Sequence, residues 1–256
     1  GYTFGRADDP FSAVVQPIDP TRTDDAGNVT FPLTLPAVGT TTQPLEAVIA
    51  VRLAEGSGRP VERKLTKPLA PAQPLIGIKP AFDGVLPENA EARFTLVAVG
   101  PDTKATPLPV KWTLTRVETT YQWYQSFGAW NWEPVTTRAR VAEGETTLNG
   151  PTEIAVPVKW GEYELAVEST DGTTAAASIP FSAGWFAAAD VSSTPDTLDL
   201  SLDKAAYAPG DTATLRLVPR FAGTALVTVL SNRVIAMQAV KVTMGENTIQ
   251  LPVTDD

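Results

Sequence analysis

The 256-residue sequence contains no cysteine and no histidine. The absence of cysteine excludes disulfides, thiol catalysis and thiolate metal sites from this chain. Without either residue, serine and cysteine triads, zinc hydrolase sites and most general-base chemistry at neutral pH lose their usual participants. Carboxylate chemistry is the one simple route left to an enzyme, so we expect no enzymatic activity, no cofactor and no metal.

Long apolar runs and clusters of positive charge are also missing. No apolar run approaches the roughly 20 residues that a membrane-spanning helix needs, and no signal peptide is recognisable. The net charge is −9, and Lys and Arg are scattered, which argues against nucleic acid and against an anionic membrane surface as partners. Because the chain opens at Gly1 without an initiator Met, we expect it to be a piece of a longer protein.

The composition is that of a folded protein with many turns. Hydrophobic residues make up 43% and charged residues 19%, and the 23 prolines and 18 glycines are spread along the chain rather than gathered in one tract. The length exceeds that of one ordinary sandwich of about 100 residues. We therefore predict an all-β chain of tandem antiparallel β-sandwich domains, immunoglobulin-like or fibronectin-type.

The first part of the chain is predicted to hold a turn and three strands before a proline-rich connector. The turn is Asp24–Gly27, where Asp and Gly favour turn geometry. Apolar and alternating residues predict strands over 28–35, 45–53 and 61–65. Pro68–Pro74 follows as a stiff extended segment, because each proline fixes φ and removes a backbone donor, and we expect a domain boundary there.

The middle part has the regular strand and turn spacing of a β-sandwich. Strands are expected over 75–79, 92–99, 110–117, 137–141, 152–158, 161–169 and 173–181, with turns at 100–102, Gly144, 149–151 and 171–172. Alternation assigns one set of residues in two of these strands to the inner face. The expected core residues are Val110, Trp112, Leu114, Tyr163, Leu165 and Val167.

The last part follows a small and polar segment, Ala187–Thr194, which we expect to be a second linker. Strands are expected over 198–203, 214–218, 225–230, 233–243 and 247–253. Pro209-Gly210 predicts a turn, because proline presets φ at the first central position and glycine supplies the positive φ at the next. No segment has a convincing helical pattern.

A short aromatic stretch is the most distinctive feature of the sequence, with six rings between residues 121 and 132. It supplies the candidate interface or packing residues Tyr121, Trp123, Tyr124, Trp130 and Trp132. Aromatic side chains bury about 150–250 Å² each and dominate cores or interfaces. A core cluster with a structured turn is the favoured interpretation. An exposed platform for sugar stacking or protein docking is the alternative.

Paired carboxylates are the remaining candidates for catalysis or metal binding. The pairs are Glu143 with Glu145, Asp8 with Asp9, and Asp24 with Asp25. A glycosidase pair needs two carboxyls about 5 Å or about 6.5–9.5 Å apart across a cleft, and calcium needs six to eight oxygens. All three pairs stand in turn contexts without a calcium-loop motif, so we interpret them as solvated turn residues.

Several motifs in a fixed order carry a resemblance to a known family. They are Gly1-Tyr-Thr-Phe-Gly5 with Thr23-Asp-Asp-Ala-Gly27, Gly58-Arg-Pro-Val-Glu62, Ile76-Gly-Ile-Lys-Pro80, Tyr121-Gln-Trp-Tyr124 with Trp130-Asn-Trp-Glu133, Trp160-Gly-Glu-Tyr163, Phe181-Ser-Ala-Gly-Trp185, and Leu202-Asp-Lys-Ala-Ala-Tyr-Ala-Pro-Gly-Asp211 leading to Phe221-Ala-Gly-Thr-Ala-Leu-Val-Thr-Val229. Together they resemble bacterial alpha-2-macroglobulins, macroglobulin-type protease traps built from a string of β-sandwich domains. The resemblance covers the whole chain.

The resemblance implies three parts and a function. Residues 1–70 would be the C-terminal part of one macroglobulin-like sandwich, 71–186 a complete one, and 187–256 the N-terminal part of the domain that carries the bait region. In the family a protease cleaves the bait, the molecule rearranges and the protease is caged. The bait should lie beyond Asp256, and because this chain has no cysteine it cannot hold the family's thioester.

The resemblance also implies partners and a location. Proteases would bind through the full-length parent, a peptidoglycan-synthesising penicillin-binding protein is a further candidate partner, and the parent would be a periplasmic protein anchored as a lipoprotein. No catalytic, cofactor or metal residue carries over. The alternative from a different class is an exported tandem immunoglobulin-like adhesin or carbohydrate-binding module that uses the aromatic stretch.

Overall fold

The computed structural model describes residues 1–9, 11–54, 58–184 and 198–255, and these residues form strands and no helix. The strands are β1 (Thr3–Phe4), β2 (Glu46–Leu53), β3 (Val61–Pro68), β4 (Leu75–Pro80), β5 (Glu91–Val99), β6 (Leu108–Ser126), β7 (Ala129–Leu148), β8 (Thr152–Pro157), β9 (Gly161–Ser169), β10 (Ala176–Ala183), β11 (Asp199–Leu202), β12 (Thr212–Val218), β13 (Gly223–Leu230), β14 (Val234–Val242) and β15 (Asn247–Pro252). Within those ranges no helix is long and apolar enough to cross a membrane. The prediction of an all-β chain is confirmed.

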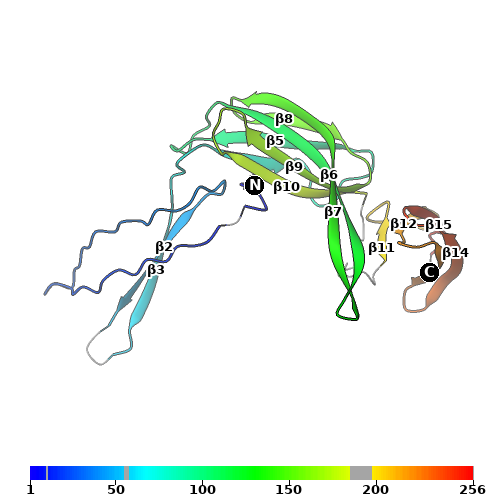
Figure 1. The fold of residues 1–256 in the computed structure, drawn as a ribbon, viewed down its shortest axis with the longest axis horizontal. Helices are drawn as coiled ribbons and strands as arrows, with labels where there is room; N and C mark the ends of the chain where they lie inside the picture. The colour runs from blue at the N-terminus through cyan, green and yellow to red at the C-terminus, as the bar shows by residue number, and fades with distance from the viewer. Residues whose placement is uncertain (10, 55–57, 185–197, 256) are drawn as a thin grey trace.

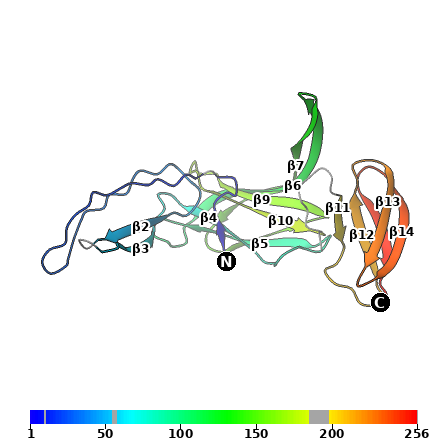
Figure 2. The same cartoon turned by 90° about the horizontal axis from the view of Figure 1, so that it is seen from below.

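The middle of the chain forms a sandwich of two four-stranded antiparallel sheets, which Figures 1 and 2 show at the centre of the molecule. One sheet has the order β1-β4-β5-β8 and the other the order β10-β9-β6-β7. Both sheets turn alternate residues inward, so one apolar core lies between them. The strand that completes the first sheet, β1, comes from the start of the chain rather than from the middle part.

The sandwich core is aromatic at one end and aliphatic elsewhere. Phe94 and Phe181 meet edge to face with ring centroids 5.2 Å apart, and Tyr163 stacks on Phe181 at 5.4 Å. Edge-to-face and offset aromatic pairs add about 0.5–1.5 kcal/mol beyond the burial of their area. The predicted inward residues lie here as expected: Val110, Leu114, Tyr163, Leu165 and Val167 are buried, and Trp112 packs against the same cluster.

The first part of the chain contains one hairpin, in which β2 pairs with β3 from Glu46↔Pro68 to Leu53↔Val61. The predicted turn at Asp24–Gly27 is present, because the Asp24 carboxylate accepts the backbone N–H groups of Ala26 and Asn28. The prediction of a strand over 28–35 is wrong, since no strand forms there. A strand needs a partner ladder, and within the described residues this proline-interrupted segment has none.

The last part of the chain forms a three-stranded sheet, β11-β12-β15, and the hairpin β13-β14. Its small core is centred on Leu217, Val242 and Ile249. The predicted Pro209-Gly210 turn is present, with Gly210 at φ +90°. We call residues 198–255 the third unit.

Two further predictions need comment. The prediction of a turn at Gly144 is wrong. This glycine lies inside β7 opposite Trp112, where an added Cβ would sit 2.7 Å from the indole ring. The glycine is required there because the ring occupies the space of its missing side chain. The predicted linker at Ala187–Thr194 lies outside the described residues.

Candidate functional site

The hairpin of β6 and β7 extends far beyond the sandwich. Strand β6 is 19 residues long and pairs with β7 over its whole length, but it pairs with β9 only from Val110 to Val117. Residues 118–137 therefore form a two-stranded ribbon that projects from the sandwich, as Figures 1 and 2 both show. Its two-residue turn has Phe127 at φ +50° and Gly128 at φ +80°, which matches the type I′ turn of tight hairpins. We call this segment the aromatic ribbon.

The aromatic ribbon exposes its rings. Trp130 is 68% exposed, Tyr124 is 43% and Trp132 is 38%, and Phe127 at the turn is fully exposed. The favoured interpretation of a core cluster is therefore wrong for Tyr124, Trp130 and Trp132. It failed because the strands continue past the sandwich, so that no second sheet faces them. The side chains of Tyr121 and Trp123 lie outside the described residues; their backbones pair with Pro134 and Trp132.

The ribbon combines apolar rings with neutral polar groups. Glu133 is the only charged residue between Thr119 and Thr137, and the remaining side chains include Gln122, Gln125 and Asn131. An exposed apolar patch rimmed by polar groups is typical of an interaction surface. Whether this surface binds a partner stays a prediction.

A second feature ties the start of the chain to the sandwich. Strand β1 pairs with β4, so that Phe4 lies opposite Gly77. Just after it, the amide of Ser178 donates to the Gly5 carbonyl at 3.1 Å, and the Ser178 hydroxyl accepts the Ala7 amide at 3.0 Å. These bonds attach residues 1–9 to both sheets of the sandwich. We call the contacts between residues 1–9 and the sandwich the first junction.

Asp9 fastens the first junction to the segment before β2. Its carboxylate accepts the amide and the hydroxyl of Thr42, both at 2.7 Å, and the Thr41 hydroxyl at 3.0 Å. The Thr42 hydroxyl in turn accepts the Arg6 amide at 2.9 Å. The bonds from the amide and hydroxyl of Thr42, followed by that from Thr41, lower the pKa of Asp9 because they stabilise the charged form.

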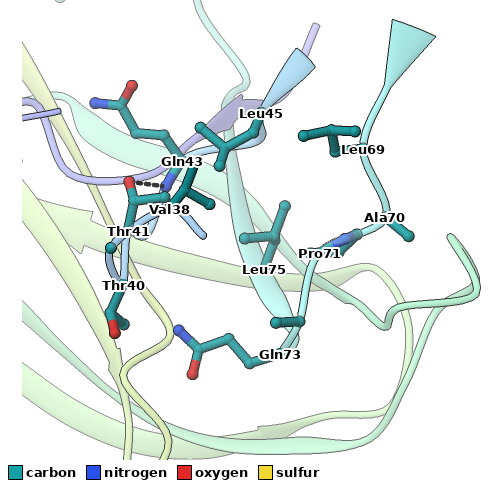
Figure 3. A pocket seen from close by; sticks show the side chains of 12 residues that line it. Val38, Thr40, Thr41, Gln43, Leu45, Leu69, Ala70, Pro71, Gln73 and Leu75 are labelled. Atoms are coloured by element: carbon teal, nitrogen blue, oxygen red, sulfur yellow. Dashed lines mark hydrogen bonds between the residues drawn. The ribbon is translucent and has the colours of Figure 1, made fainter. Parts of the chain in front are cut away.

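A hollow of about 320 Å³ lies beside this junction, between residues 38–45 and the connector after β3. Figure 3 shows Leu45, Leu69 and Leu75 turned toward it from three segments. Every lining residue is apolar or neutral polar, so the hollow offers no acid or base. The hollow lies at the boundary between the first part of the chain and the sandwich.

The candidate carboxylates have structural partners. Glu143 pairs with Lys111 at 2.8 Å and Arg140 at 3.0 Å; the hydrogen bond from Lys111, with the nearby Arg140 charge, lowers the pKa of Glu143. Asp8 pairs with Arg6, and Asp24 closes its turn. Among the described residues no group of three or more acidic side chains could hold a metal ion. Glu143, Asp8 and Asp24 therefore take part in local ion pairs and turn hydrogen bonds.

A third feature joins the sandwich to the third unit, and we call it the second junction. Arg216 of β12 is buried, and its Nη2 lies 2.9 Å from a carboxylate oxygen of Glu88, in the loop between β4 and β5. Its Nε lies 2.8 Å from Glu246 of its own unit. Its guanidinium also lies over the Trp160 ring, 4.8 Å from the centroid. The sequence motif around Trp160 does not indicate this contact, because Arg216 and Glu88 lie far from it in the chain.

Comparison with known proteins identifies the order of the parts. Family models match along the chain as the bacterial alpha-2-macroglobulin MG5 domain over residues 1–71, bacterial macroglobulin domain 6 over 77–185 and the alpha-2-macroglobulin bait region domain over 198–256. An alpha-2-macroglobulin of Xylella fastidiosa is 34% identical over 90% of this chain. The chain belongs to the bacterial alpha-2-macroglobulin family.

Other macroglobulins agree with this assignment. The alpha-2-macroglobulin of Escherichia coli is 30% identical over 72% of the chain. The cryo-EM structure of the native conformation of the E. coli protein shares 25% identity over 84% of the chain, with a TM-score of 0.53. The chain spans only 14% of the Xylella protein, 12% of the curated E. coli protein and 15% of the solved chain.

The family assignment locates the candidate features within a macroglobulin. The aromatic ribbon belongs to macroglobulin domain 6, whose family match covers 77–185. The first junction joins the MG5 and domain 6 segments, since β1 and β4 fall in different matches. The second junction joins domain 6 to the bait region domain, because Glu88 and Trp160 lie in one match and Arg216 in the other.

Proposed function

We propose that this chain is a non-catalytic scaffold segment of a macroglobulin that traps proteases after cleavage of its bait. The observation that carries the proposal is the order of the family matches, which ends in a bait region domain at residues 198–256. The lack of His and Cys agrees with it, since inhibition by caging requires no catalytic group in the inhibitor. The bait itself would follow Asp256.

The arrangement of the domains supports a scaffold role. The sandwich holds the largest core and is joined to a neighbour on each side, by the first junction and by the second. A scaffold of this kind transmits position: it keeps the bait region domain in one place before cleavage and lets it move afterwards. We propose proteases as partners of the full-length protein and a penicillin-binding protein as a second partner. We place the full-length protein in the periplasm, anchored as a lipoprotein.

The test is made on the full-length protein that contains this chain. It is treated with several unrelated proteases, the earliest cut is mapped by mass, and the bound protease is assayed on a small peptide and on a large protein substrate. We expect a first cut shortly after Asp256, retention of the protease, and loss of activity on the large substrate only. Scattered cuts with free, fully active protease would contradict the proposal, and a catalytically inactive protease is the control.

The aromatic ribbon favours a second candidate function, binding of a neutral glycan. The exposed Trp130 and Phe127, with amide side chains and almost no charge around them, are suited to stack on and hydrogen-bond an uncharged sugar chain. Titration with cell-wall and plant glycans is followed by tryptophan fluorescence. A saturable change that Trp130→Ala removes would support this function. If no glycan changes the tryptophan fluorescence, glycan binding by the aromatic ribbon is contradicted.

A further inference from the structure

The sandwich and the third unit keep separate cores. The sandwich core and the core around Leu217 share no residue, and among the described strands none of β11–β15 pairs with a strand of the sandwich. Figures 1 and 2 show the third unit as a distinct body at one end of the sandwich. Among the described residues, the side chain of Arg216 makes a buried contact between the third unit and the sandwich.

The sandwich presents a prepared surface to Arg216. The Tyr163 hydroxyl donates to the Lys159 carbonyl at 2.9 Å and accepts the Lys159 amide at 3.2 Å, which fixes the loop that carries Trp160. Gly184 lies close to Trp160 and Glu88: a Cβ there would be 3.0 Å from the indole and 3.4 Å from the Glu88 Cβ. The sandwich therefore packs closely around the Trp160 ring and the base of the Glu88 side chain.

Arg116 strengthens the same surface from inside the sandwich. Its guanidinium lies 5.4 Å from the centroid of the Trp160 ring. Gly161 leaves the space for it, since a Cβ at that position would be 2.9 Å from the Arg116 Nε. An indole ring attracts cations to its faces, and the attraction grows when water is excluded. The Trp160 ring therefore contacts one guanidinium from the sandwich, that of Arg116, and one from the third unit, that of Arg216.

Arg216 has partners on both sides of the second junction, so it can leave the sandwich without losing all of them. Glu88 and Trp160 belong to the sandwich, whereas Glu246 belongs to the same unit as Arg216. A buried charge that loses all its partners is strongly destabilised. If the third unit moves away, Arg216 keeps Glu246 and gains water, so the contact with the sandwich can open and close without unfolding either domain.

We propose that Arg216 is a positioning residue that holds the third unit on the sandwich through a releasable contact with Glu88 and Trp160. In the full-length protein this contact would set where the bait region domain stands before a protease cuts, and its release would let that domain move after the cut. That last step rests on the proposed function. The contact of Arg216 with Glu88 and Trp160 does not depend on the proposed function, and it can be tested without a protease.

The test measures the distance between the two domains in the 256-residue chain. The chain has no cysteine, so Glu153→Cys on β8 and Gln238→Cys on β14, both exposed, give two unique spin-label positions. Pulsed electron-resonance distances are recorded with native Arg216, with Arg216→Met, with Arg216→Lys and with Glu88→Gln. We expect one narrow distribution for the native contact and a broad or shifted one for Arg216→Met and Glu88→Gln. Arg216→Lys should lie between them, because lysine keeps the charge but not the planar stack.

Arg93→Met is the matched control. Arg93 also pairs with a glutamate, Glu91, but it is exposed and lies within one sheet of the sandwich, so its loss should leave the distances unchanged. Glu88→Gln decides the test if Arg216→Met disturbs the third unit, because Glu88 lies outside that unit. A native-like narrow distribution for Glu88→Gln in the folded chain would overturn the proposal. A failed protease test with a broadened distribution would leave the positioning role in place and remove only its link to trapping.

Discussion

The two junctions of this chain depend on different kinds of interaction. The first junction uses mainly backbone hydrogen bonds: β1 adds an edge strand to the sandwich, the Ser178 amide bonds the Gly5 carbonyl, and the Ser178 hydroxyl adds one side-chain bond to the Ala7 amide. The second junction uses side chains, with Arg216 reaching Glu88 and Trp160. A strand pairing is spread over several main-chain groups, whereas a side-chain contact can be lost by one rotation or one substitution.

This difference indicates which boundary stays fixed and which moves. Separating β1 from β4 breaks main-chain hydrogen bonds, each of which contributes about 0.5–1.5 kcal/mol net. Arg216 is buried, but if it leaves Glu88 and Trp160 it keeps Glu246 and can gain water, so its charge would not be left without a partner. The MG5 segment and domain 6 should therefore move as one piece, and the bait region domain should move against them.

The largest expected effect comes from disrupting the first junction. In Gly77→Leu the new side chain would meet the Phe4 ring, since even a Cβ there lies 2.8 Å from it and 3.0 Å from Val97. Overpacking of this kind costs about 3 kcal/mol, and we expect β1 to detach. Thermal unfolding and amide exchange of residues 3–7 measure both effects. Gly223→Leu is the control, because a Cβ at that strand glycine meets nothing; equal losses for the two variants would contradict the prediction.

A smaller effect is expected at the second junction from Gly184→Val. Gly184 has φ +72°, a conformation that costs a β-branched residue about 2 kcal/mol. Its new side chain would also press on Trp160 and Glu88. We expect a lower unfolding temperature together with a shifted distance between the domains, whereas Gly77→Leu should leave that distance unchanged. The comparison between the junctions would fail if both variants moved the third unit equally.

A single hydrogen bond of the first junction gives a smaller effect again. Ser178→Ala removes the acceptor of the Ala7 amide and should cost about 1 kcal/mol. Amide exchange at Ala7 should accelerate by about five-fold, with the β1–β4 pairing still protected. Ser182→Ala is the control, since its hydroxyl bonds the Glu162 carboxylate at the surface of the sandwich and its loss should fall within about 0.5 kcal/mol. Loss of protection throughout β1 in Ser178→Ala would show that one side chain, not the backbone ladder, holds this junction.

Sandwich strands with clear alternation were predictable from the sequence. Strand β9 runs over Gly161–Ser169 as predicted, since Tyr163, Leu165 and Val167 mark its inner face without ambiguity. The segment 28–35 also alternates, yet it forms no strand. Alternation states which side a residue would face, whereas strand formation depends on a partner elsewhere in the chain, and local sequence does not contain that information.

The candidate sites were predictable in composition but not in environment. Aromatic residues mark cores and surfaces equally, so the stretch around Trp130 was assigned to the core. Its length held a usable signal: β6 and β7 span 19 and 20 residues around one tight turn, whereas β9 spans 9, so part of the hairpin had to leave the sandwich. The sequence contains no comparable signal for the Arg216–Glu88 contact, because these two residues are 128 positions apart in the chain.

The smallest expected effect concerns Asp9 and sharpens the comparison through pH. The pKa of Asp9 lies below its ordinary value because the Thr42 amide, the Thr42 hydroxyl and the Thr41 hydroxyl bond the charged form. An unfolded aspartate titrates near about 3.9. A lowered folded pKa means that Asp9 contributes its full stabilisation above about pH 4 and loses it as pH falls through the folded pKa.

We therefore expect the protection factor of the Thr42 amide to stay constant between neutral pH and about pH 5 and to fall below about pH 4. Asp9→Asn should lower the protection at neutral pH and remove its acid dependence, whereas Asp19→Asn, in the exposed loop, should change neither. The pairing of β1 with β4 contains no titrating side chain and should persist where the Asp9 bonds open. Simultaneous loss of both on acidification would mean that the Asp9 side chain, and not the strand, holds the MG5 segment to domain 6.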